Sequence, residues 1–96
     1  MNHTVARFSL LTALCLALVS CGGKIATAEG QRCSNGINQA SKELEDAKVK
    51  GFGGSIQWSK AAGLLTAAST QMQLEHFGSC IDKVERARTY IREAQK

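Results

Sequence analysis

The sequence lacks two patterns that would define other fold classes. No stretch alternates apolar and polar residues for long enough to predict a β-strand. No apolar run reaches the roughly twenty residues that a transmembrane helix requires, because the longest run, residues 8–19, has only about a dozen. We therefore expect an all-α protein that does not span a membrane.

The sequence also lacks a recognisable catalytic constellation. After residue 20 it has one histidine, His76, with no Ser, Cys or carboxylate partner at a readable spacing, which favours a solvated histidine in a turn. A Cys-x-x-Cys redox motif is missing, and the glycines of residues 51–54 lack the Lys-Ser/Thr pair of a phosphate-binding loop. Glu43, Glu45 and Asp46 have basic neighbours, which indicates a solvated charged face instead of a metal site. We predict no enzymatic activity, no metal and no cofactor.

The amino terminus has the layout of an export signal. Residues 1–7 are weakly basic, residues 8–19 are apolar, and small residues precede Cys21. The segment Leu18-Val19-Ser20-Cys21 resembles the lipobox of bacterial lipoproteins. The resemblance covers about the first quarter of the chain. It implies a signal peptide over residues 1–20, cleavage before Cys21, a diacylglyceryl group on the Cys21 thiol and an acyl chain on its new amino group.

The same resemblance implies a location. In lipoproteins of enteric-type bacteria, Asp after the lipidated cysteine favours retention in the inner membrane, and this sequence has Gly22. We therefore expect a lipid-anchored protein of the outer membrane that faces the periplasm, with the periplasmic side of the inner membrane as the alternative. Two lipid signals are enough for stable anchoring. This compartment excludes nucleic acid as a partner.

Two cysteines remain for a disulfide after export. Cys15 lies in the predicted signal peptide and Cys21 carries the predicted lipid, so Cys33 and Cys80 can pair in an oxidising compartment. Closing this loop would stabilise the fold by about 4 kcal/mol. The alternative is two free buried thiols. Residues 21–32 are expected to form the lipidated end and a flexible tether, because they show no periodicity, and residues 33–96 the domain.

Three apolar stripes with helical spacing predict three helices, at about residues 33–50, 55–74 and 78–95. The stripes are Cys33, Ile37, Ala40, Leu44 and Ala47; then Trp58, Ala61, Leu65, Ala68 and Met72; then Phe77, Cys80, Val84, Ala87, Ile91 and Ala94.

Short turns between these helices predict an up-down-up three-helix bundle with Cys33 and Cys80 at the same end. Ser55 is the predicted N-cap of the second helix, and Ser79 with Asp82 has capping-box spacing for the third. In the alternative arrangement, the last two helices merge into one long rod.

Residues 64–87 resemble a single tetratricopeptide repeat. The resemblance rests on the packing positions Leu64, Ala67, Ala68, Phe77, Cys80, Val84 and Ala87. The Tyr position of the family's first helix is Gln71 here, and no second copy follows, whereas repeat arrays need about three units. The resemblance therefore implies a helical hairpin and a possibility of peptide binding.

Five residues are candidates for contacting a partner. Phe52 and Trp58 flank the first turn, where they either cap the end of the bundle or, if exposed together, form an aromatic anchor. Arg86, Arg88 and Arg92 make the third helix basic, which either solubilises the domain or attracts acidic partners, anionic lipids or wall carboxylates. Arg88 shares a turn with the apolar stripe, so we expect it to be partly buried.

We predict that the protein is a non-catalytic binding or accessory module of a cell-envelope process, with an envelope protein as its partner. One alternative is an inhibitor of a cell-wall hydrolase, for which residues 51–55 are the only candidate loop. Another is a structural protein whose basic third helix contacts peptidoglycan or anionic lipid. The sequence sets neither the partner's identity nor the oligomeric state.

Overall fold

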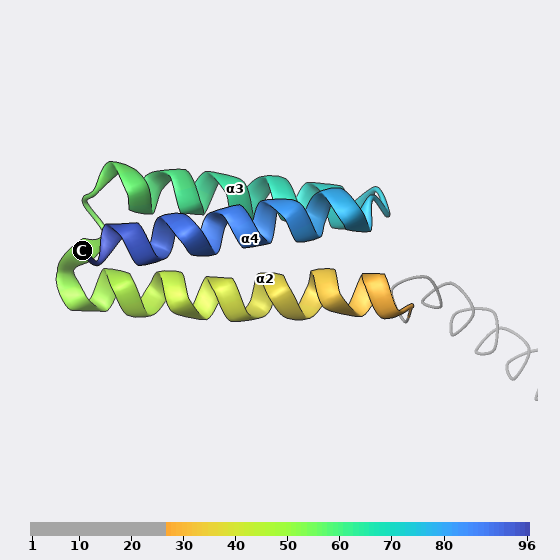
Figure 1. Cartoon of the computed structure of the whole chain (residues 1–96), viewed down its shortest axis with the longest axis horizontal. Coiled ribbons are helices and arrows are strands. Elements are labelled where there is room, and N and C mark those ends of the chain that lie inside the picture. The colour runs from red at the N-terminus through yellow and green to blue at the C-terminus, as the bar shows by residue number, and fades with distance from the viewer. Residues whose placement is uncertain (1–26) are drawn as a thin grey trace, which may run out of the picture.

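The computed structural model describes residues 27–96. The predicted signal peptide, Cys21 and the first part of the predicted tether lie outside the described residues. In the described part the chain forms three α-helices and no strand: α2 (Ala28–Ala47), α3 (Ile56–Gln73) and α4 (Phe77–Ala94). Consecutive helices run in opposite directions, and α4 is drawn between α2 and α3 in Figure 1. The predicted up-down-up bundle is therefore confirmed, and the last two helices do not merge into one rod.

The start of α2 differs from the sequence prediction, because the helix begins at Ala28 instead of near residue 33. Thr27 caps it: the Thr27 Oγ1 accepts a hydrogen bond from the Gly30 N–H at 3.2 Å, and Glu29 places a negative charge in the first turn. Residues 28–32 thus belong to the helix and not to a flexible tether. The apolar stripe begins only at Cys33, so periodicity carried no signal for this extra turn.

The turn between α2 and α3 follows the predicted position. The chain passes through η1 (Lys48–Phe52), a wider helical turn in which Gly51 has a φ of 99°. Glycine adopts this conformation without the steric penalty that a Cβ would add. Ser55 then caps α3 as predicted, since its Oγ accepts a hydrogen bond from the Trp58 N–H at 3.1 Å.

The turn between α3 and α4 is a Schellman motif. The His76 N–H donates to the Gln71 carbonyl at 2.9 Å, and the Glu75 N–H donates to the Met72 carbonyl at 3.0 Å. Glu75 has a φ of 61°, a left-handed conformation that glycine usually takes in this motif. The two hydrogen bonds satisfy the carbonyls of Gln71 and Met72 in the last turn of α3, and the chain reverses within three residues.

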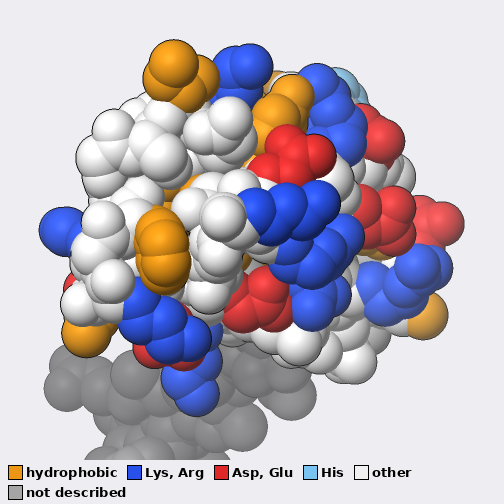
Figure 2. Space-filling model, turned by 60° about the vertical axis from the view of Figure 1, so that its left-hand side comes forward, with side chains coloured by type: hydrophobic (Ala, Val, Ile, Leu, Met, Phe, Trp, Pro, Cys, Tyr) orange, Lys and Arg blue, Asp and Glu red, His pale blue; other side chains and the backbone are white. Residues whose placement is uncertain are grey.

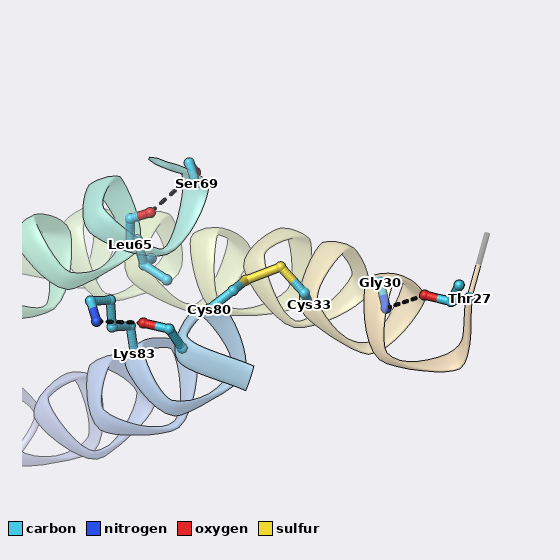
Figure 3. Close-up of a disulfide and its surroundings, with 8 residues drawn as sticks. Thr27, Gly30, Cys33, Leu65, Ser69, Cys80 and Lys83 are labelled. Atoms are coloured by element: carbon cyan, nitrogen blue, oxygen red, sulfur yellow. Dashed lines mark hydrogen bonds between the residues drawn. A yellow bond between two sulfur atoms is a disulfide. The ribbon is translucent and has the colours of Figure 1, made fainter. Parts of the chain in front are cut away.

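The predicted capping box at the start of α4 is wrong. The helix begins at Phe77 with His76 as a cap that makes no side-chain hydrogen bond, so Ser79 already lies inside the helix. Its Oγ accepts a hydrogen bond from the Lys83 Nζ at 2.9 Å (Figure 3). Because the Schellman motif closes α3 just before it, α4 starts earlier than the Ser79–Asp82 spacing indicated.

The core consists mainly of small side chains on the three predicted stripes. The buried apolar residues are Cys33, Ala40, Ala47, Ala61, Leu65, Ala68, Cys80, Val84, Ala87, Ile91 and Ala94. Two of them form the predicted disulfide, with the Cα atoms of Cys33 and Cys80 5.7 Å apart (Figure 3). The bridge ties the second turn of α2 to the first turn of α4, at the end of the bundle where Thr27 lies.

Side chains of α3 make one polar contact with each of the other two helices. The Trp58 Nε1 of α3 donates to the Leu44 carbonyl of α2 at 3.0 Å. The Lys60 Nζ of α3 lies 5.4 Å from the centre of the Tyr90 ring of α4, a cation–π distance. The contact between α3 and α4 is the most extensive of the helix contacts.

Candidate functional site

The aromatic candidates lie at the end of the bundle opposite Thr27. Phe52 and Trp58 are both half-buried and pack against the core. The indole N–H of Trp58 is occupied by the Leu44 carbonyl, so its polar edge is not presented to solvent as a free donor. The two aromatic side chains therefore cover the end of the core instead of standing exposed together as an anchor.

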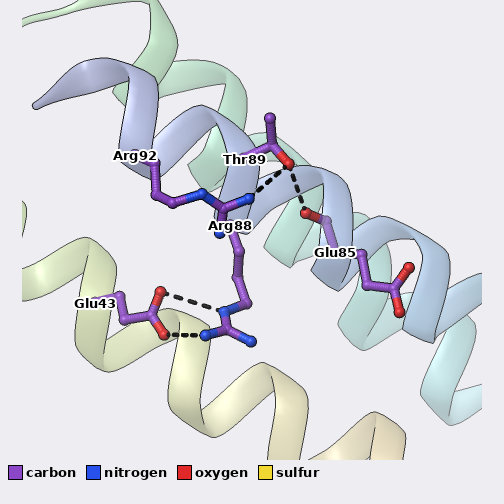
Figure 4. A network of polar contacts seen from close by, with 5 residues as sticks. All are labelled: Glu43, Glu85, Arg88, Thr89 and Arg92. Atoms are coloured by element: carbon purple, nitrogen blue, oxygen red, sulfur yellow. Dashed lines mark hydrogen bonds and ion pairs between the residues drawn. The ribbon is translucent and has the colours of Figure 1, made fainter. Parts of the chain in front are cut away.

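Arg88 joins two helices. Its Nη2 lies 2.9 Å from the Glu43 Oε1, and its Nε donates to the Glu43 Oε2 at 3.3 Å (Figure 4). This fork-like pairing uses both carboxylate oxygens and crosses from α4 to α2. The side chains of Arg88 and Glu43 are 37% and 30% exposed, so the expected partial burial of Arg88 is confirmed. The Arg88 guanidinium is therefore paired with a carboxylate of the same domain.

Arg86 lies on a different face of α4 from Arg88, whereas Arg92 follows Arg88 by one turn, about 40° away. Arg86 lies 3.7 Å from Asp82, and the Arg92 Nη2 donates to the Thr89 Oγ1 at 3.2 Å (Figure 4). Six residues of α-helix separate Arg86 from Arg92, which places them about 120° apart around α4. Basic and acidic side chains are interspersed on the face shown in Figure 2. The basic third helix is thus a mixed surface and not one cationic patch.

His76 lies in the α3–α4 turn and is exposed. Its Nδ1 is 3.1 Å from the Gln71 Oε1, and this contact spans the two positions of the Schellman motif that are commonly joined by an apolar contact. The position in a turn is the one that the sequence predicted. The side chain that contacts the imidazole is the Gln71 amide, which cannot serve as a general acid or base.

The three neighbouring acidic residues of α2, Glu43, Glu45 and Asp46, do not form one cluster in the structure. Glu43 turns to Arg88, while Glu45 and Asp46 are exposed. Within residues 27–96, no group of three or more His, Cys, Asp or Glu side chains has a metal-binding arrangement.

A shallow groove of about 290 Å³ lies on the surface along the contact between α2 and α4. Its floor is formed where α2 passes close to α4: a Cβ added to Gly36 would come within 3.0 Å of the Val84 Cγ1. Arg32 and Gln39 of α2 and Glu85 and Arg88 of α4 form part of its polar rim. Sequence reasoning missed this groove because Arg32 and Gln39 lie outside the apolar stripes and their approach to α4 depends on helix packing.

In the described domain, three large apolar side chains that the sequence analysis did not select are exposed. Val49 is 79% exposed, Ile56 is 71% exposed and Leu74 is 57% exposed. Val49 and Ile56 flank the α2–α3 turn, whereas Leu74 precedes the α3–α4 turn. All three lie outside the apolar stripes of the helices. An apolar residue at a sequence position that does not face the core was therefore the feature from which their exposure could have been predicted.

Comparison with known proteins gives no match to a family model, to a curated protein sequence or to a solved structure. In the described part of the chain, no helix combines the length and the apolar character that crossing a bilayer requires.

Proposed function

We propose that this chain is a lipid-anchored, periplasm-facing lipoprotein that acts by binding, as an accessory module of a cell-envelope process. One observation carries the proposal. The Cys33–Cys80 bridge uses both cysteines of residues 27–96, so Cys21 has no disulfide partner there. Cys21 also closes the apolar run in the sequence context that resembles a lipobox.

The disulfide supports export. Structural disulfides form and persist in oxidising compartments, and both sulfur-bearing side chains are fully buried in the core. A small domain with an Ala-rich core gains much of its stability from such a bridge. A chain that stayed in a reducing cytosol would lack this contribution.

The surface supports binding more than catalysis. The candidate polar groups are paired structurally: Arg88 with Glu43, Arg86 with Asp82 and His76 with Gln71. Among residues 27–96, the exposed large apolar side chains lie at the two ends of the bundle. Such exposed apolar side chains are suited to contacts with another surface.

The proposal is tested by the mass of the protein purified from the membranes of a diderm bacterial host. We expect the mass of residues 21–96 plus a diacylglyceryl group and an acyl chain. The Cys21→Ser variant should retain residues 1–20 and carry no lipid. The matched control, Cys15→Ser, removes the other cysteine outside the described domain and should be processed normally. An unmodified amino terminus in the cytosolic fraction would contradict the proposal.

Binding is tested with the same material. Cross-linking in intact cells followed by purification is expected to recover the same envelope protein repeatedly, and to lose it with Cys21→Ser because the variant is not released to its site. Recovery of no specific partner in repeated experiments would count against an accessory role while leaving the lipid anchor intact.

A further inference from the structure

At the end of the bundle that contains Thr27, the described domain exposes the apolar side chain of Leu74 close to the half-buried Phe77. The start of α2, the α3–α4 turn and the start of α4 meet there (Figure 1). They form an open hollow of about 490 Å³ whose lining includes Thr27, Glu75 and Phe77. Phe77 is half-buried, and Leu74, in the adjoining turn, is 57% exposed.

The N–H groups of the α3–α4 turn are satisfied by backbone carbonyls. The Leu74 N–H donates to the Thr70 carbonyl, and the N–H groups of Glu75 and His76 are used in the Schellman motif. Burial of an unpaired N–H group opposes transfer to an apolar environment. Because the N–H groups of its turn are paired, the Leu74 side chain can enter an apolar environment without this cost. This property distinguishes the turn from an ordinary solvated loop.

The sequence places this end close to the proposed anchor. Residues 22–26 separate Cys21 from Thr27, so the Cα atoms of Cys21 and Thr27 can be at most about 20 Å apart. By helix rise, Val49 lies about 33 Å further along the bundle axis from Thr27. Acyl chains on Cys21 would hold the Thr27 end near the headgroups and leave the opposite end beyond the reach of the tether.

We propose that the Thr27 end of the bundle rests on a phospholipid surface, with Leu74 and Phe77 in contact with the boundary between headgroups and acyl chains. This inference rests on the proposed lipid anchor. In the described part of the chain, the charged groups in the first two turns of α2 and α4 and in the turn before α4 are Glu29, Arg32, Glu75, Asp82 and Lys83, with His76 beside Glu75, and the tether contains one further cation, Lys24. They do not form a cationic cluster, so the contact uses apolar side chains and the tether, and a zwitterionic lipid surface suffices. The Val49 and Ile56 end then faces away from the bilayer.

The contact depth of three positions distinguishes this orientation from others. Tryptophan is placed at Leu74, at Val49 and at Thr66, which is exposed in the middle of α3. Trp58→Phe supplies the background without native tryptophan. The acylated proteins are incorporated into phosphatidylcholine vesicles with or without bromine atoms on the acyl chains, because bromine quenches tryptophan only at close range. Far-ultraviolet circular dichroism and a non-reducing gel verify the helices and the disulfide of every variant.

We expect Leu74→Trp to be quenched at least about twofold more than Val49→Trp and Thr66→Trp, because an interfacial contact reaches only the surface of the hydrocarbon region. Equal quenching at Leu74 and Thr66 would show that α3 lies flat on the bilayer and would overturn the inference. Association with vesicles but no quenching at Leu74 would overturn the inference alone. Failure of the wild-type protein to associate with vesicles would overturn the lipid anchor, and this inference with it.

Lipid charge provides a second readout. Adding phosphatidylglycerol to the vesicles is expected to leave the quenching of Leu74→Trp unchanged at low and high salt, because the contact is apolar. A large increase that salt abolishes would instead assign the contact to the basic residues of α4 and would overturn the inference.

Discussion

Helices α3 and α4 have the same length and share the most extensive contact of the bundle, yet their compositions are opposite. Lys60 is the only charged residue of α3, whereas α4 has seven charged residues among its eighteen. The buried residues of α4 form a stripe of five, but α3 buries only Ala61, Leu65 and Ala68. Helix α4 therefore packs mainly by placing side-chain volume in the core, whereas α3, with its mostly small buried side chains, packs by letting the neighbouring helices come close.

The uncharged surface of α3 is less polar than its Ser and Thr content indicates. The hydroxyl groups of Thr66, Ser69 and Thr70 donate to the carbonyls four residues earlier in the same helix. These hydrogen bonds leave methyl groups and small side chains at the surface. By contrast, α4 connects to α2 through the disulfide and the Arg88–Glu43 pair, so the three helices are held together mainly through α4.

The largest expected effect comes from removing the covalent link between α2 and α4. The double variant Cys33→Ser/Cys80→Ser should lose about 4 kcal/mol of unfolding free energy, because the unfolded chain regains the freedom of the closed loop. Urea unfolding under non-reducing conditions measures this loss. Adding a reductant should destabilise the wild-type protein by a similar amount and leave the double variant unchanged. Equal stability of the two proteins without reductant would contradict the prediction.

The next effect tests side-chain volume in α4. Ile91 is 1% exposed and is among the largest fully buried side chains. Ile91→Ala should cost about 3 kcal/mol of unfolding free energy because it leaves a cavity in a core with few large side chains. The neighbouring exposed residue provides the control, and Arg92→Ala should change the free energy by less than about 0.5 kcal/mol. Similar losses for both variants would mean that α4 is not held by its buried stripe.

A smaller effect tests close approach by α3. Ala68 is fully buried, so Ala68→Leu adds volume where the helices are in contact and should cost about 2 kcal/mol. Ala67→Leu makes the same change at a half-buried neighbour and should cost less. Thermal or urea unfolding of the two variants measures the difference. If Ala68→Leu is tolerated as well as Ala67→Leu, the contact between α3 and the other helices is looser than the structure indicates.

The smallest effect compares two helical glycines. A Cβ at Gly63 of α3 would meet no atom within 4 Å, so Gly63→Ala should stabilise the protein by about 0.5–1 kcal/mol through helix propensity. Gly36→Ala in α2 gains the same propensity but brings the new Cβ within 3.0 Å of the Val84 Cγ1. We expect Gly36→Ala to be less stable than Gly63→Ala in urea unfolding. The reverse order would mean that α2 and α4 separate at no cost.

The helices could be predicted because their stripes repeat regularly. The spacing of the apolar residues from Cys33 to Ala47 and from Phe77 to Ala94 identified the helix faces that the structure buries. The N-cap at Ser55 could be predicted because a serine directly before an apolar stripe is typical of a helix start. The first turn of α2 and the start of α4 could not be predicted in this way. At Ala28 and Phe77 the helix is decided by capping and by a backbone turn, and neither leaves a periodic signal.

The candidate contact residues were less predictable than the helices. Sequence position indicated that Arg88 would be partly buried, but its partner Glu43 is 45 residues away and belongs to another helix. Phe52 and Trp58 are placed at the same end of the bundle as expected, yet whether they face the core or solvent depends on how α2 and α3 meet. Leu74 was overlooked because an isolated apolar residue off a stripe gains meaning only when its end of the bundle is known.

By itself, the sequence determined the three helices and their inward faces, because periodicity is a property of the chain alone. It predicted the pairing of Cys33 with Cys80 but left two free thiols as an alternative, which the structure excludes. Only the tertiary structure decided which charges cancel, where the helices approach closely and which apolar side chains remain at the two ends. These outcomes depend on distances between residues far apart in the sequence, and such distances exist only after the helices have packed.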